Sequence, residues 1–313
     1  MSGTPAGAPT SAGAVGAATN ARAAGAATNA RAAGAATLDH IGVCTRDGPG
    51  LWAAYEALGF HLTPLARQSG RRHPGAPVEP FATGNRCAML RQGYLELLAI
   101  LEPALFDNRI GAFLERYTGM HIVAFGIDDA EAELARLRRA GIDIPGVAHL
   151  ERPVDDPEGP RARFARLPLP DAPEGRLQLI QHLTPELLWQ PRWLEHPNRA
   201  VALEAAILAA EAPAVSAAAL SRLTGHPLEP DPAGGYALPL PQGRLRILPP
   251  EALARVLPGV EAPALPFLAG CVLRTDDGNA AIRRIAGEAL RPVPGGLMVP
   301  PALAGGTALV FAA

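Results

Sequence analysis

The chain has 313 residues, about twice the size of a typical domain, so its length predicts two domains or one domain built from repeats. Hydrophobic residues make up 48% and charged residues 19%, which supports a sizeable core and argues against extensive disorder. The 28 basic side chains are all arginine, and the net charge is -2. These values exclude lysine-dependent chemistry, such as Schiff bases and phosphate-loop lysines, and give no electrostatic footprint for nucleic acid.

The three cysteines are widely spaced and form no CxxC pair, so neither a disulfide framework nor a cysteine zinc site is indicated. A reducing compartment is therefore expected, with a cytoplasmic location. No run reaches the roughly 18 to 20 apolar residues that a membrane span requires, so we expect no membrane partner.

Residues 1–37 differ in texture from the rest of the chain. They contain no Leu, Ile, Phe, Trp or acidic residue, and the nonapeptide GAATNARAA occurs twice in succession, from Gly16 and from Gly25. Such a segment cannot bury enough apolar surface to offset its ordering entropy. We predict a disordered tail.

Residues 38–190 predict two successive βαβββ units. The first has a strand at 38–47, a helix at 48–60 and two strands within 86–100. The second repeats the order with a strand at 120–129, a helix at 130–142 and two strands within 162–183. The sequence therefore predicts an α+β domain of two paired units.

The first strands of the two units carry matching polar landmarks. His40 and His121 stand at the same place in their strands, and an aspartate follows each histidine at the same spacing, Asp47 and Asp128. A chance resemblance of texture would not keep this register, so we interpret the units as an internal repeat.

The later landmarks agree to within one residue. The helices end at Gly59 and Gly141, and the second glycine lies one residue further from its histidine than the first does. In the last strands, Gln178 likewise lies one residue further from His121 than Glu96 lies from His40.

Residues 199–313 repeat the strand, helix and strand order twice more, in shorter form. The histidine positions hold apolar residues there, near Ala206 and Ala269, and the last-strand positions hold Arg246 and Leu309. We predict a second, degenerate domain, which makes four βαβββ units in two pairs.

If the units of the first pair pack about a pseudo-twofold axis, their repeated polar side chains converge in one cleft. Two imidazoles, a carboxylate and an amide oxygen are ligands that suit Zn, Fe, Mn, Ni or Co with coordination positions left open. We therefore predict a divalent metal site formed by His40, Glu96, His121 and Gln178.

The βαβββ order and the strands DHIGV, YLELLA and MHIVAFGIDD resemble the vicinal oxygen chelate superfamily, in particular its glyoxalase-like branch. The resemblance is clear over 38–190 and faint over 199–313. It implies a metal held by the first and fourth strands of paired units, which chelates two neighbouring oxygens of a substrate. Members similar to glyoxalase I have a proton-shuttling glutamate where this chain has Gln178, and glutamine cannot act as a base.

The catalytic base would then be Glu96 or His182, which lies on the same strand face as Gln178. Four further side chains on the flanking loop and strands are candidates to bind an oxygen-rich or anionic substrate: His73, Asn85, Arg86 and Tyr94.

The leading hypothesis is a metal-dependent lyase, isomerase or hydrolase of this type, in which the metal acts as a Lewis acid on a small-molecule substrate. The first alternative is a non-heme Fe(II) ring-cleaving or other dioxygenase, because two histidines and a carboxylate form its ligand set. The second is a small-molecule-binding protein without turnover. The sequence leaves room for a homodimer.

Overall fold

The computed structural model describes residues 34–72, 75–154 and 158–313. Most of the predicted tail, 1–33, and the candidate His73 lie outside these residues. The first strand begins before its predicted start, at Ala35, where it pairs with Ile127.

The first unit has the predicted βαβββ order. Asp47 caps its helix by accepting a hydrogen bond from the amide of Gly50 at 2.9 Å, and Gly59 follows the helix with a φ of 79°. Its elements are β1 (Ala35–Thr45), α1 (Gly48–Ala57), β2 (Ala66–Gly70), β3 (Glu79–Met89) and β4 (Tyr94–Ile100).

The second unit repeats this order after a short extra helix, α2 (Ile110–Leu114). Its own helix is capped by Asp129, which accepts from two backbone amides at 3.0 Å, and Gly141 follows with a φ of 73°. Its elements are β5 (Gly119–Ile127), α3 (Ala130–Arg139), β6 (Ala148–Pro153), β7 (Arg161–Leu167) and β8 (Arg176–His182).

Two shorter units follow, as predicted, after the 3-10 turns η1 (Pro185–Leu187) and η2 (Pro191–Trp193). The third unit consists of β9 (Ala200–Ala209), α4 (Pro213–Thr224), β10 (Glu229–Pro230), β11 (Tyr236–Pro239) and β12 (Arg244–Leu248), and α5 (Pro250–Val256) follows it. The fourth consists of β13 (Phe267–Thr275), α6 (Ala280–Ala286), β14 (Arg291–Val293), β15 (Gly296–Val299) and β16 (Ala308–Ala312), with turns η3 (Gly287–Ala289) and η4 (Pro301–Leu303).

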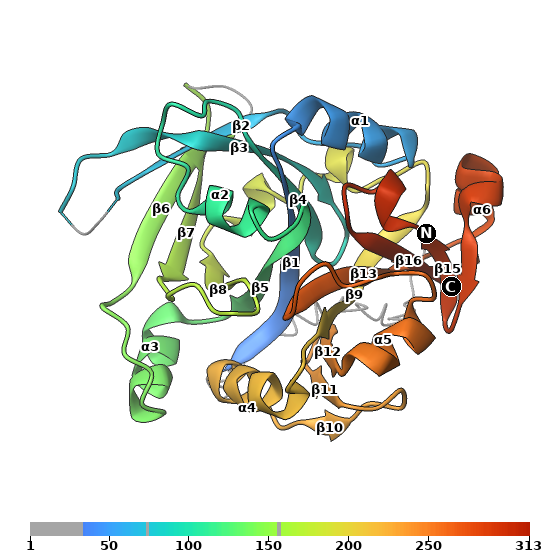
Figure 1. The fold of residues 1–313 in the computed structure, drawn as a ribbon. Coiled ribbons are helices and arrows are strands. Elements are labelled where there is room, and N and C mark those ends of the chain that lie inside the picture. Colours follow the sequence, from blue (N-terminus) through green and yellow to red (C-terminus); the bar gives the residue numbers. More distant parts are fainter. Residues whose placement is uncertain (1–33, 73–74, 155–157) are drawn as a thin grey trace, which may run out of the picture. The chain divides into compact units, whose positions relative to one another are not determined.

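The described strands form one sheet of two half-sheets, which are joined where Leu268 of β13 pairs with Met120 of β5 (Figure 1), and the fold is α+β as predicted. The first has the order β2-β3-β4-β1-β5-β8-β7-β6, and the second has the order β10-β11-β12-β9-β13-β16-β15-β14. In each, the first strands of two units pair antiparallel at the centre, β1 with β5 and β9 with β13. The two units of a pair thus meet along one strand pair.

Each half-sheet has an outer face, which packs on the unit helices, and an inner face. One apolar cluster joins the outer faces of both half-sheets with residues of α1, α3, α4 and α6, including Tyr55, Leu134, Leu220 and Ile282. This shared core accounts for most of the apolar burial, which is the main favourable contribution to folding.

The inner faces are filled differently in the two pairs. In the second, α5 contributes Leu253 and Val256 to an apolar cluster with Phe267, so its inner face is occupied by the chain's own helix. In the first, α2 packs Phe113 against one end, and the segment 183–199 packs Leu188 against the other. Polar side chains remain between these two apolar ends, which is where a candidate site can form.

Candidate functional site

The register of the first half-sheet defines which positions of the two units are equivalent. Gly42 pairs with Glu96 in the first unit, and Ala124 pairs with Gln178 in the second. The interval along the chain from Gly42 to Ala124 equals the interval from Glu96 to Gln178. Glu96 and Gln178 are therefore equivalent, as predicted. His40 pairs with Ala124 and Ile122 pairs with Gly42, so the counterpart of His40 is Ile122 rather than His121.

His121 lies in a β-bulge, the extra residue between the pairs that Met120 and Ile122 make with β1. Its ring is fully buried, stacks on Tyr117 with centroids 3.9 Å apart, and donates from Nε2 to the Tyr117 carbonyl at 2.8 Å. Burial lowers its pKa from 6.5 to about 4. These contacts make His121 part of the packing beside α2.

Glu96 lies on the inner face with 8% of its surface exposed. One carboxylate oxygen, Oε1, accepts a hydrogen bond from the Asn85 amide and a longer one, 3.5 Å, from Gln68. Asn85, a predicted substrate-binding residue, therefore holds Glu96 in place. Such hydrogen bonds offset part of the cost of burying a carboxylate.

The predicted metal set does not fit this arrangement. The alkyl side chain of Ile122 occupies the position equivalent to His40, and His121 uses Nε2 for the Tyr117 carbonyl. Among the described residues, no group of three or more His, Cys, Asp or Glu side chains is placed to hold a metal ion. His40, Glu96 and His121 are thus not brought together as a three-ligand site of the expected kind.

Two other candidates make contacts within the fold. Arg86 hydrogen bonds the Thr63 carbonyl at 2.9 Å and pairs with Glu56 at 2.8 Å, which ties β3 to α1 and the segment after it. Tyr94 stacks on His40 with centroids 4.3 Å apart. Burial raises the pKa of Tyr94 well above 10, so this phenol stays protonated.

A carboxylate that joins two histidines is the main polar feature near the end of β8. Asp39 accepts from Nδ1 of His40 through Oδ1 at 2.7 Å, and it contacts Nε2 of His182 through Oδ2 at 2.9 Å. Burial alone would raise the pKa of Asp39, but the hydrogen bonds and charge of His182 and His40 outweigh it and hold the pKa well below 3.8. Asp39 is therefore a carboxylate at neutral pH.

Asp39 reaches this position because it is the extra residue of a second bulge. The pairing of β1 with β5 shifts between Leu38 and His40, which turns Asp39 to the same side as His40. Strict strand alternation would place the two side chains on opposite faces.

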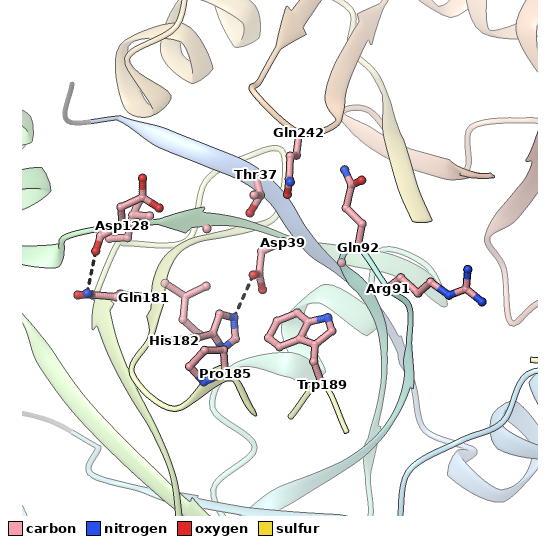
Figure 2. Close-up of a pocket in the computed structure, with 14 residues that line it drawn as sticks. Thr37, Asp39, Arg91, Gln92, Asp128, Gln181, His182, Pro185, Trp189 and Gln242 are labelled. Atoms are coloured by element: carbon pink, nitrogen blue, oxygen red, sulfur yellow. Dashed lines mark hydrogen bonds and ion pairs between the residues drawn. The ribbon is translucent and has the colours of Figure 1, made fainter. Parts of the chain in front are cut away.

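The Asp39–His182 pair lines a pocket of about 420 Å³, which we call the acid–base pocket. Figure 2 shows Asp39 and His182 joined at its wall, with the Trp189 ring beside them and Arg91 directed away. The indole lies perpendicular to the His182 ring, with centroids 4.9 Å apart. The remaining lining combines polar side chains with non-polar residues: Thr37, Arg91, Gln92, Asp128, Gln181 and Gln242, with Gly93, Gly126, Ile127, Ile180 and Pro185.

Sequence reasoning singled out His182 but missed Asp39 and Trp189. Asp39 directly precedes His40 in the DHIGV strand, but only the bulge brings its carboxylate to His40 and His182. Trp189 stands in a segment with no periodic signal, WQPRW, and its contact with His182 depends on where that segment crosses the half-sheet.

Comparisons with known proteins agree with the fold. The family described as a glyoxalase-like domain matches residues 38–224. A solved structure of a hypothetical protein from Staphylococcus aureus superposes with a TM-score of 0.58 at 12% identity, covering 88% of this chain and 98% of that one. A variant of 4-hydroxymandelate synthase from Streptomyces coelicolor superposes with a TM-score of 0.55 at 14% identity, covering 86% and 78%.

At these identities the superpositions show a shared fold. No functionally curated protein sequence matches the chain significantly. None of the helices in the described ranges is long and apolar enough to cross a membrane.

Proposed function

Since the chain belongs to the glyoxalase-like domain family, within the vicinal oxygen chelate superfamily, we propose that it is an enzyme that acts by proton transfer at Asp39 and His182. The observation that carries the proposal is the buried carboxylate bonded to both imidazoles in the wall of the acid–base pocket. A histidine oriented by a carboxylate is a recurring arrangement in general acid–base catalysis.

Because Asp39 is ionised, its contacts show which ring nitrogen of His182 and of His40 carries a proton. A carboxylate only accepts, so each contacting nitrogen carries a proton: Nε2 of His182 and Nδ1 of His40. In the neutral ring, the other nitrogen of His182, Nδ1, is then the basic one. This nitrogen is buried and has no hydrogen-bond partner among the described residues.

The proposed step moves one proton from a substrate carbon next to a carbonyl to Nδ1 of His182. The electron pair of the C–H bond passes to the carbonyl oxygen and forms an enolate, and Asp39 stabilises the imidazolium. Return of the proton to the original carbon gives exchange with solvent. Its return to the former carbonyl carbon, while the proton of the substrate hydroxyl passes to the enolate oxygen, completes an isomerisation of a hydroxycarbonyl compound. The amide of Gln242, which faces Thr37 and Asp39 in Figure 2, can donate to the enolate oxygen.

The lining indicates an uncharged hydroxycarbonyl substrate. Glutamine amides and the Thr37 hydroxyl both donate and accept, which matches hydroxyl and carbonyl groups. Arg91, the one guanidinium of the lining, pairs with Glu195 at 2.7 Å and with Asp276 at 3.4 Å. The ionised Asp39 therefore disfavours anions in this pocket.

Because Nδ1 is buried, substrate can reach this base only when a side chain packed on the His182 ring, Trp189 or Phe164, moves aside. Aromatic side chains packed on a base in this way exclude water from the reacting groups.

The test measures the exchange of carbon-bound protons of dihydroxyacetone and acetoin for solvent deuterium. The exchange is monitored by proton NMR in D₂O. We expect wild-type protein to accelerate loss of the carbon-bound proton signals, and His182→Asn and Asp39→Asn to lose about 100-fold or more of that rate. His149→Asn, the same change at an exposed histidine, is the control and should exchange like wild type.

Adding a metal chelator separates this proposal from a metal-dependent enzyme, and the exchange assay itself separates it from a binding protein without turnover. Exchange by His182 should continue in EDTA; if it stops and returns with Zn, Fe, Mn, Ni or Co, the metal-dependent enzyme gains support. Saturable binding of the probes with no exchange in wild-type protein would favour a binding protein without turnover.

A further inference from the structure

A second cavity, of about 300 Å³, is lined by other residues of the segment 185–193 than those that line the acid–base pocket. It is bounded by the chain leading into β2, by β3, by the end of β6 and by this segment. Its lining is mostly apolar: Thr63, Pro64, Leu65, Ala66, Arg67, Cys87, Met89, Arg152, Pro153, Val154, Leu187, Leu188, Gln190 and Trp193.

Among the described residues that line this cavity, the charged ones are two arginines and none is acidic. Arg67 is largely exposed and pairs with Glu102 at 3.2 Å. Arg152 is half-buried, lies 6.0 Å from the centre of the Phe164 ring, and has no acidic partner among the described residues. In the described part of the chain, no carboxylate of the lining therefore offsets the charge of the Arg152 guanidinium.

A guanidinium held against apolar side chains loses part of its hydration, and an anion that forms charge-assisted hydrogen bonds with it compensates for that loss. The planar fork of donors on arginine matches a carboxylate in two-point contact. Met89, Leu188 and Trp193 provide apolar contact for the rest of a ligand. The volume is near the lower limit for small-molecule sites, so the ligand must be small.

We propose that this cavity binds a small carboxylic acid with an apolar body, whose carboxylate pairs with Arg152. The site differs in charge from the acid–base pocket, where Asp39 disfavours anions, so the two cavities select different compounds. The proposal goes beyond the proton-transfer function and does not depend on it.

Cys87 contributes apolar wall here rather than reactivity. Burial raises the pKa of its thiol to about 12, so the thiol stays neutral at physiological pH. The ligand is therefore expected to bind reversibly.

The two cavities carry one tryptophan each, Trp193 here and Trp189 in the acid–base pocket, so fluorescence reports which one a ligand occupies. The probe is benzoate, with benzamide as its neutral counterpart of similar shape. We expect benzoate to change the emission saturably in wild type and Trp189→Phe, and the change to be lost in Trp193→Phe.

Calorimetry then measures the contribution of the charge. Arg152→Gln should weaken benzoate binding about tenfold or more while leaving benzamide binding unchanged, because only the carboxylate gains from the guanidinium. Arg163→Gln is the matched control, since it removes the same charge from an exposed position on β7 and should bind like wild type.

Three results would overturn the site: no saturable benzoate binding at millimolar concentration, equal benzoate affinity in folded Arg152→Gln, or a fluorescence change that depends on Trp189 instead of Trp193. A melting curve of Arg152→Gln confirms folding. Since these measurements use no turnover, they stand whether or not the exchange assay succeeds.

Discussion

The buried ring of His121 makes the stability of this protein depend on pH. Its folded pKa is about 4, lowered from 6.5 first by burial, which the hydrogen bond to the Tyr117 carbonyl only partly opposes. Below pH 6.5 the unfolded chain binds a proton at this position that the folded chain does not bind until about pH 4. Stability from this group is therefore fully present above pH 6.5 and is lost as the pH falls toward 4.

The size of this effect follows from the shift. At about 1.4 kcal/mol per pKa unit, the full loss is about 3 kcal/mol, and linkage assigns about 2 kcal/mol of it to the interval between pH 7 and pH 5. The perturbation is His121→Phe, which keeps a ring against Tyr117 and Phe113 but cannot bind a proton. The variant leaves the Tyr117 carbonyl without its donor, which costs about 1 to 3 kcal/mol at any pH.

The assay is equilibrium urea unfolding of wild type and variant at pH 7 and pH 5. We expect the stability deficit of His121→Phe at pH 7 to shrink by about 2 kcal/mol at pH 5. Burial also lowers the pKa of His196, but this histidine is present in both proteins and cancels in the comparison. His149→Gln should follow wild type; equal deficits for His121→Phe at the two pH values would refute the assignment of the shift to this ring.

Three further outcomes are expected. Gly42→Ala should cost about 1 to 3 kcal/mol in urea unfolding, because an added Cβ would lie 2.7 Å from the Cβ of Ile122. Arg246→Gln should cost about 3 kcal/mol in the same assay, since it removes both 2.7 Å contacts from the buried Asp231 carboxylate; a loss below about 1 kcal/mol would show the pair to be unimportant. Protein purified without added metal should contain well under one equivalent of Zn, Fe, Mn, Ni or Co by mass spectrometry; a stoichiometric metal that Glu96→Gln removes would contradict the donor geometry.

The sequence was sufficient for the βαβββ order of the units because that order depends on local signals, but it did not predict the extra helices α2 and α5. Capping by Asp47, the glycines after the helices and the alternation of strand residues each act within a few positions. The sequence also predicted that Glu96 and Gln178 are equivalent, because the two units keep the same register up to their last strands. By contrast, the packing of α5 on the inner face of the second half-sheet depends on contacts between distant segments.

The predicted metal set paired His121 with His40, although these two histidines are one residue out of the register of the repeat. The interval from His40 to His121 is one residue shorter than the interval between the two helix glycines, Gly59 and Gly141, which equals that between the two last-strand positions. The helix cap agrees with the longer interval, since Asp129 caps α3 and follows Ile122 at the spacing at which Asp47 follows His40. The mismatch of one residue in the sequence was therefore the signal that His121 is the counterpart of Asp39, the bulge residue of β1, and that Ile122 is the counterpart of His40.

A β-bulge on the other central strand, β1, forms part of the proposed acid–base site. A bulge in β5 places His121 between aromatic rings, and a bulge in β1 brings Asp39 onto the side of His40 and within reach of His182. Alternation rules assign every strand residue to one of two faces, so they misplace the residue at a bulge. Bulges are common where a strand must redirect a side chain. In this half-sheet the bulge residues Asp39 and His121 are therefore the ones that strand alternation assigns to the wrong face. They are also the positions at which the site differs from the four metal ligands that the family resemblance implied.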